Sequence, residues 1–155
     1  MEKTVLEKMI SDCLDIFMVN DNYLLAHNVH EQAISGALAC YLKQRIPTRK
    51  EGGWDVDVEY NRNGERPKLL KDRNVKPDII IHRRGLNNPN GNENNNLLII
   101  EIKINPKVKN KTKDIEKIHA FIKSPPYNYK YGLFISFNTN NPDEYPYSLE
   151  WYDKV

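Results

Sequence analysis

The sequence predicts a single α/β domain in which a mixed central β-sheet is flanked by α-helices. Three features indicate this fold class. Two amphipathic patterns with helical spacing fill the first 45 residues, and apolar runs typical of strands follow from residue 54 onwards. A third helical pattern separates two of those runs. Because a helix between two strands is normally a crossover connection, we expect that pair of strands to be parallel.

The first two helices are predicted from stripes of apolar side chains. Residues 2–19 carry one stripe and end at the turn-forming residues 20–22. Residues 28–45 carry the second stripe, which stops before Pro47. Glu31 falls on the inward face of this helix, close to its start. Such a carboxylate is either favoured there by the helix dipole or aimed at a metal site.

The strands are predicted from alternation and from branched apolar runs. Residues 54–60 alternate strictly, and we interpret the face with Asp55, Asp57 and Glu59 as solvated rather than as a metal cluster. Residues 61–75 are a polar loop. The remaining strands are expected at residues 76–82, 96–104, 131–137 and 148–153, with a helix at residues 114–123.

The strand at residues 96–104 contains two charges, Glu101 and Lys103, in an otherwise apolar run. Side chains alternate along a strand, so both share one face. Burying ionised groups is costly unless they are paired or bind a metal. If residues 83–95 form the turn of a hairpin, Asp78 lies opposite Lys103 or its neighbours. The hairpin then gathers these charges either as an internal ion-pair group or as a metal site.

Composition limits the class of protein. At 155 residues, 39% hydrophobic and 28% charged, the chain has the size and composition of one globular domain. A net charge of +2 gives no overall basic excess, so any nucleic-acid surface must be local. No segment is long enough to span a membrane. Cys13 and Cys40 lie in helical apolar patterns, which predicts buried, reduced thiols and a cytoplasmic protein.

The residues around the hairpin resemble a known motif. Pro77 and Asp78 on one strand, followed by Glu101, Ile102 and Lys103 at the end of the next, are similar to the motif of the PD-(D/E)XK nuclease superfamily. A preceding helix with an inward glutamate strengthens the likeness. The resemblance covers roughly residues 28–137 of a single domain spanning 1–155, and it points to small stand-alone members. It implies a restriction-endonuclease-like fold.

The resemblance also implies an activity and a cofactor. Members hydrolyse phosphodiester bonds with Mg²⁺ or Mn²⁺, hard ions that prefer carboxylate oxygens. By resemblance, Asp78, Glu101, the Ile102 carbonyl and Glu31 hold the metal. Lys103 positions or deprotonates the attacking water, or stabilises the charge on the phosphate. We therefore expect a metal-dependent nuclease that acts on DNA rather than RNA.

Two alternatives to this expectation stay open. One is a catalytically silent nucleic-acid-binding module on the same fold. The other is a structural or protein-interaction domain in which the charged strand holds only an internal ion pair. The candidates for phosphate contacts are Arg62, Lys68, Arg83 and Lys117. A domain of this size has little surface with which to hold a duplex, so a homodimer or a partner protein is a further hypothesis.

Overall fold

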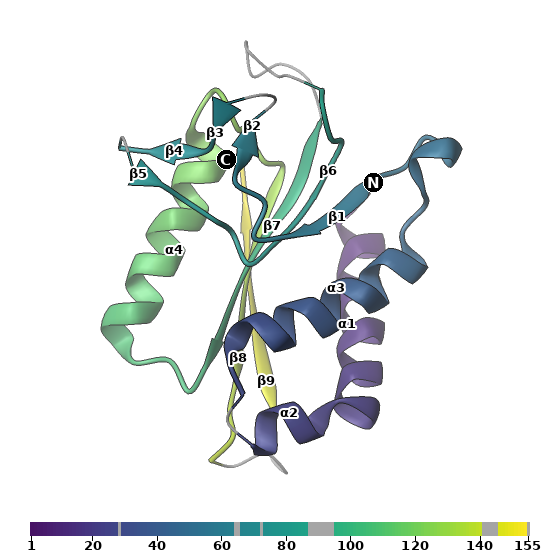
Figure 1. The fold of residues 1–155 in the computed structure, drawn as a ribbon, viewed down its shortest axis with the longest axis vertical. Coiled ribbons are helices and arrows are strands. Elements are labelled where there is room, and N and C mark those ends of the chain that lie inside the picture. Colours follow the sequence, from purple (N-terminus) through teal and green to yellow (C-terminus); the bar gives the residue numbers. More distant parts are fainter. Residues whose placement is uncertain (28, 64–65, 72, 87–94, 141–145, 155) are drawn as a thin grey trace.

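A mixed β-sheet forms the centre of the molecule (Figure 1). The computed structural model describes residues 1–27, 29–63, 66–71, 73–86, 95–140 and 146–154. In this part of the chain, five strands pair in the order β1-β6-β7-β8-β9. They are β1 (Asp55–Val58), β6 (Ile79–His82), β7 (Asn96–Ile104), β8 (Tyr131–Phe137) and β9 (Tyr147–Asp153). Only the β7–β8 pair of this sheet is parallel, which confirms the predicted mixed sheet.

Helices cover both faces of the sheet (Figure 1). On one face lie α1 (Lys3–Asn20) and α3 (Glu31–Arg45), with the short α2 (Asn22–Ala26) between them in the chain. On the other face lies α4 (Val108–Lys123). Alternating strand residues feed the two cores: Ile79 and Ile81 belong to the α1–α3 side, while Ile80 and Ile99 belong to the α4 side. The fold is therefore a three-layer arrangement with an apolar core on each side of the sheet.

The helix α4 is the crossover that joins the parallel strands β7 and β8, as expected from the sequence. It packs very closely on β8 at Gly132. A Cβ atom added to Gly132 would lie 2.2 Å from Ile118 Cγ2 and 3.0 Å from Ile122 Cδ1. The absence of a side chain at this position lets α4 approach the sheet.

Helix α4 begins at Val108, six residues before the predicted start at Asp114. The intervening lysines were interpreted as a basic loop after Pro106. Lysine is a good helix former, so nothing in this segment opposes helix once Pro106 has been passed. The earlier start adds about 1.7 turns to the N-terminal end of α4.

The segment predicted as a polar loop, residues 61–75, contains local pairing. Strand β2 (Arg62–Asn63) pairs with β3 (Arg66–Pro67), and β4 (Leu69–Leu70) pairs with β5 (Arg73–Asn74). The Tyr127 hydroxyl anchors this segment: it donates to the Leu69 carbonyl at 2.7 Å and accepts from the Leu69 N–H at 2.6 Å. The segment is thereby fixed to the C-terminal end of α4.

Only one of the two cysteines follows the prediction. Cys13 is buried, but Cys40 is exposed, and both are free thiols. The buried residues of this part of α3 are Leu38, Ala39 and Leu42, so residue 40 lies on the solvent side of the helix.

Among the described residues, none of the helices has the length and apolar character needed to cross a bilayer.

Candidate functional site

The charged end of β7 lies beside Asp78. The hairpin register pairs Ile79 with Ile100, which sets Asp78 opposite Glu101. This is two residues nearer the turn than Lys103, within the range that the sequence allowed. Asp78 Oδ2 accepts a hydrogen bond from the Ile102 N–H at 2.7 Å. The hairpin thus brings the two predicted metal-binding carboxylates to one place.

Glu31 reaches the same place from α3, of which it is the first residue. Its Oε2 lies 2.7 Å from Lys103 Nζ, and its Oε1 accepts a 3.3 Å hydrogen bond from the Ile104 N–H. This side chain ties the start of α3 to the end of β7. A cavity of about 360 Å³ opens beside it, lined by Val29, His30, Glu31, Ile104 and Asn105.

Helix α4 adds two charged side chains. Lys117 Nζ lies 2.7 Å from Glu101 Oε2, and Asp114 Oδ2 lies 3.7 Å from Lys103 Nζ. Lys117 was predicted only as a phosphate contact, and Asp114 was not predicted to belong to the site. The two residues are three apart on one face of the helix, a spacing that the predicted helix at 114–123 already contained. We call the six residues the carboxylate–lysine cluster: Glu31, Asp78, Glu101, Lys103, Asp114 and Lys117.

Glu101 is the most deeply buried member of the carboxylate–lysine cluster, at 1% exposure. Its Oε1 has no hydrogen-bond partner among the described residues. Burial raises the pKa of Glu101 to about 8; the charge of Lys117 opposes this shift and the charge of Asp78 adds to it. A buried carboxylate oxygen without a partner is costly. Glu101 Oε1 is therefore placed to bind either a cation or a proton.

The pKa values of two other members also shift. Burial raises the pKa of Asp78, against the opposing effects of the Ile102 N–H and the charges of Lys117 and Lys103. Burial alone would lower the pKa of Lys103, but the hydrogen bond to Glu31 and the nearby carboxylates raise it overall. Lys103 is therefore held as an ammonium at neutral pH, which suits donation and charge neutralisation better than proton abstraction.

The donor set of the cluster fits a hard divalent ion in kind. Asp78 and Glu101 offer carboxylate oxygens, which Mg²⁺ and Mn²⁺ prefer. Within the described ranges, no three His, Cys, Asp or Glu side chains are grouped closely enough to hold a metal together. Mg²⁺ commonly binds through only one or two carboxylates and keeps several waters. Asp78 and Glu101, whose Oε1 has no partner among the described residues, supply that number of carboxylates. Ile102 follows Glu101 in β7, and its side chain is buried.

The acidic face of β1 is not solvated, contrary to the interpretation of its sequence. Asp57 is buried; it bonds His82 Nε2 through Oδ2 at 2.8 Å and pairs with the Arg84 guanidinium. Although burial acts to raise it, the pKa of Asp57 is held well below its usual range by His82 and Arg84. Asp55 accepts the Arg84 N–H, and Glu59 accepts from the Gln32 amide. The partners on β6 and its following turn were not readable from alternation alone.

The candidate phosphate contacts lie in different settings. Arg62 is exposed on β2. Arg83 is half-buried, stacks on the Trp54 ring at 4.6 Å and donates to the Gly52 carbonyl at 3.0 Å. Lys117 lies inside the carboxylate–lysine cluster. Arg62, Lys68 and Arg83 line one small cavity, whereas Lys117 pairs with Glu101, so the structure brings three of the four predicted contacts together.

Lys68, the fourth candidate, is buried at 2% exposure. Its ammonium lies over the rings of Tyr60 and Tyr129, at 4.8 and 5.9 Å from their centroids. Burial lowers the pKa of Lys68 to about 7. This side chain lines the small cavity beside Arg62 and Arg83 but is almost wholly buried there. Nothing in the polar composition of its segment indicated that burial.

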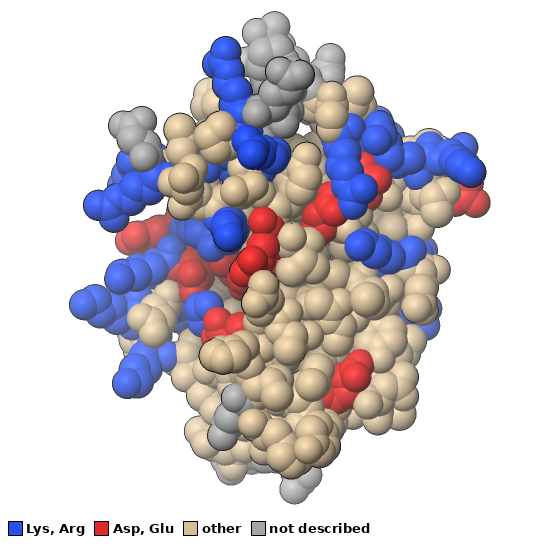
Figure 2. Space-filling model, viewed as in Figure 1, with Lys and Arg blue, Asp and Glu red and all other residues tan. Residues whose placement is uncertain are grey.

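Charge is distributed in bands on the face that Figure 2 shows. Acidic side chains cross the middle of this face, and Lys and Arg gather on both sides of them, over α4 and over the region after α3.

Comparison of the chain with protein-family models, curated proteins and solved structures gave no match. The function is therefore inferred from the geometry of the site.

Proposed function

We propose that this protein is a metal-dependent nuclease that hydrolyses phosphodiester bonds, with DNA as its substrate. The observation that carries the proposal is the convergence of Glu31, Asp78, Glu101 and Lys103 from α3, β6 and β7 at one strand end. The unpartnered, buried Oε1 of Glu101 supports it further. The resemblance of these residues to the PD-(D/E)XK motif is the reason for choosing phosphodiester hydrolysis among metal-assisted reactions.

Each residue has a role in this proposal. Asp78 and Glu101 would hold the Mg²⁺ or Mn²⁺, with the Ile102 carbonyl as a further ligand and Glu31 as a water-mediated one. When bound, the metal supplies Lewis acidity and lowers the pKa of a bound water. Lys103, kept protonated by Glu31 and Asp114, neutralises charge on the phosphate and orients the water. The cavity lined by Glu31 and Ile104 lies beside this group of residues.

A second candidate is a catalytically silent module on the same fold. One observation favours it: each carboxylate of the motif already has a partner. Glu31 pairs with Lys103, Glu101 pairs with Lys117, and Asp78 accepts the Ile102 N–H. In this case the cluster ties α3 and α4 to the sheet, and divalent ions do not bind. The two candidates differ in metal binding and in turnover.

The test is cleavage of plasmid, linear and single-stranded DNA with Mg²⁺, Mn²⁺ or EDTA. Wild type is compared with Asp78→Asn and Lys103→Ala, and with the surface variant Asp12→Asn on α1 as a matched control. We expect metal-dependent cutting that falls at least about 100-fold in the two cluster variants and persists in the control, since such groups stabilise transition-state charge. Circular dichroism checks that all four proteins fold.

Calorimetric titration with Mn²⁺ completes the comparison. Binding by wild type that is lost in Asp78→Asn agrees with the nuclease. If wild type neither cuts any of the three substrates nor binds metal, the proposal is wrong and the silent module is supported.

A further inference from the structure

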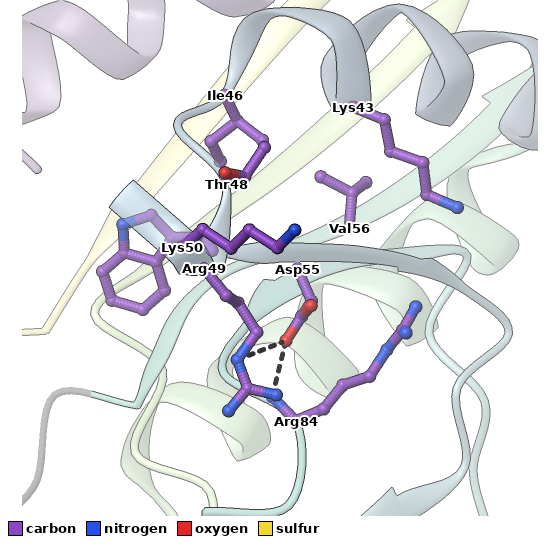
Figure 3. Close-up of a pocket in the computed structure, with 9 residues that line it drawn as sticks. Lys43, Ile46, Thr48, Arg49, Lys50, Asp55, Val56 and Arg84 are labelled. Atoms are coloured by element: carbon purple, nitrogen blue, oxygen red, sulfur yellow. Dashed lines mark hydrogen bonds and ion pairs between the residues drawn. The ribbon is translucent and has the colours of Figure 1, made fainter. Parts of the chain in front are cut away.

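A basic pocket lies at the end of β1 that is farther from the carboxylate–lysine cluster. Figure 3 shows its lining side chains. It is a cavity of about 470 Å³, a volume in the range of ligand sites in proteins. Its walls come from the end of α3, the 3₁₀ turn η1 (Arg49–Glu51) and β1. The lining residues are Lys43, Ile46, Thr48, Arg49, Lys50, Trp54, Asp55, Val56 and Arg84. We call this cavity the β1 pocket.

The backbone that shapes the β1 pocket is tightly fixed. Glu51 and Thr48 cap η1 reciprocally, with the Thr48 N–H donating to Glu51 Oε2 at 2.9 Å. Gly53 passes so close to the preceding segment that an added Cβ would lie 1.8 Å from the Pro47 carbonyl oxygen. The Trp54 N–H then donates to that same oxygen at 2.9 Å. The pocket is therefore a built feature of the fold and not a gap between loose side chains.

The β1 pocket combines an apolar floor with a cationic rim. Ile46 and Val56 are buried and Trp54 is half-buried. Four cationic side chains line the pocket with a single carboxylate, Asp55. This carboxylate is already bound: it accepts the Arg84 N–H at 2.9 Å and lies 3.6 Å from Arg49 Nε. Figure 3 shows the ends of the cationic side chains placed around the strand at residues 55 and 56.

Two of the four cations are uncommitted. Arg49 pairs with Asp55, and Arg84 pairs with Asp57. The side chains of Lys43 and Lys50 make no hydrogen bond or ion pair with any residue that the structure describes. Apolar surface beside unpaired ammonium groups suits a ligand that carries both a phosphate and a flat apolar base.

The β1 pocket is aligned with the carboxylate–lysine cluster along one strand. Residues 55 and 56 line the pocket, while Glu59, just past the other end of β1, donates its N–H to the Asp78 carbonyl. At roughly 3.3 Å per residue, Glu59 lies roughly 10–13 Å along the strand from residues 55 and 56, which line the pocket. One nucleic-acid strand, with a rise of about 3.4 Å per nucleotide, covers this span in roughly three to four nucleotides.

We propose that the β1 pocket binds a backbone phosphate and base of a nucleic-acid strand, roughly three to four nucleotides from the strand's position at the carboxylate–lysine cluster. Lys43 and Lys50 contact the phosphate, and the Trp54 side of the pocket receives the base. The choice of nucleic acid as the ligand rests on the proposed function. The pocket itself is outside the motif residues and serves to position the strand.

The experiment measures binding of a fluorescent twelve-nucleotide DNA in EDTA, by anisotropy at several salt concentrations. The test variant is Lys43→Ala with Lys50→Ala. The matched control is Lys8→Ala with Lys123→Ala, which removes the same charge from exposed positions on α1 and α4. A third variant, Lys43→Arg with Lys50→Arg, keeps the charge. Circular dichroism checks the fold of each variant.

We expect the double alanine variant to bind at least about tenfold more weakly at low salt, with a salt slope reduced by about 2. The control and the arginine variant keep wild-type affinity within about twofold, and a deoxynucleoside monophosphate competes far more weakly than the twelve-nucleotide strand. Three results would each overturn the proposal: no binding by wild type, equal binding by the alanine and control variants, or a monophosphate that competes as well as the strand.

Failure of this proposal is distinguishable from failure of the proposed function, because no divalent metal is present during the titration. A wild type that never cleaves DNA but binds it through Lys43 and Lys50 supports the pocket and removes the nuclease. A wild type that cleaves DNA with binding insensitive to these lysines keeps the nuclease and removes the pocket.

Discussion

At the scale of single residues, Glu101 carries the clearest physical signal. It is buried beside another carboxylate, and one of its oxygens has no partner among the described residues. Its pKa is raised by burial to about 8, although Lys117 lies 2.7 Å away. The ion pair with Lys117 favours an ionised Glu101, whereas the raised pKa favours a protonated one. We give burial the greater weight, because Lys117 satisfies only Oε2 and leaves Oε1 desolvated.

This raised pKa predicts a pH-dependent stability. The unfolded carboxyl releases its proton near its ordinary pKa, whereas the folded one keeps it until about pH 8. The folded state therefore binds more protons between these values, and stability falls as the pH rises through this window. In EDTA, Glu101→Gln should lose this component, so its free energy of unfolding should gain on wild type by up to a few kcal/mol between pH 5 and pH 9.

Urea denaturation at pH 5, 7 and 9 measures this difference. The control is Glu7→Gln on the surface of α1, which should follow wild type across the range. A constant difference between Glu101→Gln and wild type would mean that Glu101 is ionised in the folded protein throughout.

At the scale of elements, the sequence was most informative where apolar runs are bounded by breakers. The predicted strands at 96–104 and 131–137 coincide with β7 and β8, because turn residues and prolines bound both runs. The start of α4 was missed, since a lysine-rich stretch after a proline reads equally as loop or helix. Asp114 lay inside the predicted helix, but its contact with Lys103 depends on how α4 packs beside β7. The motif residues were found because hairpin geometry brings them together, whereas partners from distant segments, such as Lys117 for Glu101, depend on packing.

The contact between α4 and β8 predicts a sharp cost for a small change. Gly132→Ala would place a methyl group against Ile118 and Ile122, at distances that force α4 away from the sheet. We expect a loss of about 1–3 kcal/mol in the free energy of unfolding, as for other overpacked cores. The matched control is Gly36→Ala in the interior of α3, where no atom lies within 4 Å of the added Cβ. That variant should gain about 0.5–1 kcal/mol, since alanine favours helix.

Thermal or urea unfolding of the two variants tests this contrast. Equal stability of Gly132→Ala and wild type would show that α4 can shift without cost. The cluster residues on α4 would then be less firmly placed than we infer.

At the scale of the whole molecule, ligand binding should raise global stability. A metal that binds only the folded chain stabilises it by about 2.7 kcal/mol at a concentration of 100 times its Kd. Saturating Mn²⁺ should therefore raise the Tm of wild type by several degrees, and the increase should be absent in Asp78→Asn. The surface variant Asp12→Asn should respond as wild type does. A similar increase in all three proteins would place the metal outside the cluster.

The parallel pairing of β7 and β8 also governs when the site comes into existence. Leu98 pairs with Tyr131, so the chain between them must close a long loop before the first of these contacts forms. Closing such loops is slow because its entropic cost precedes any gain. The same segment contains Asp114 and Lys117. In a chain emerging from the ribosome, the β6–β7 pair and α4 are therefore made before β8, and α4 is fixed beside the acidic residues only when β8 pairs with β7.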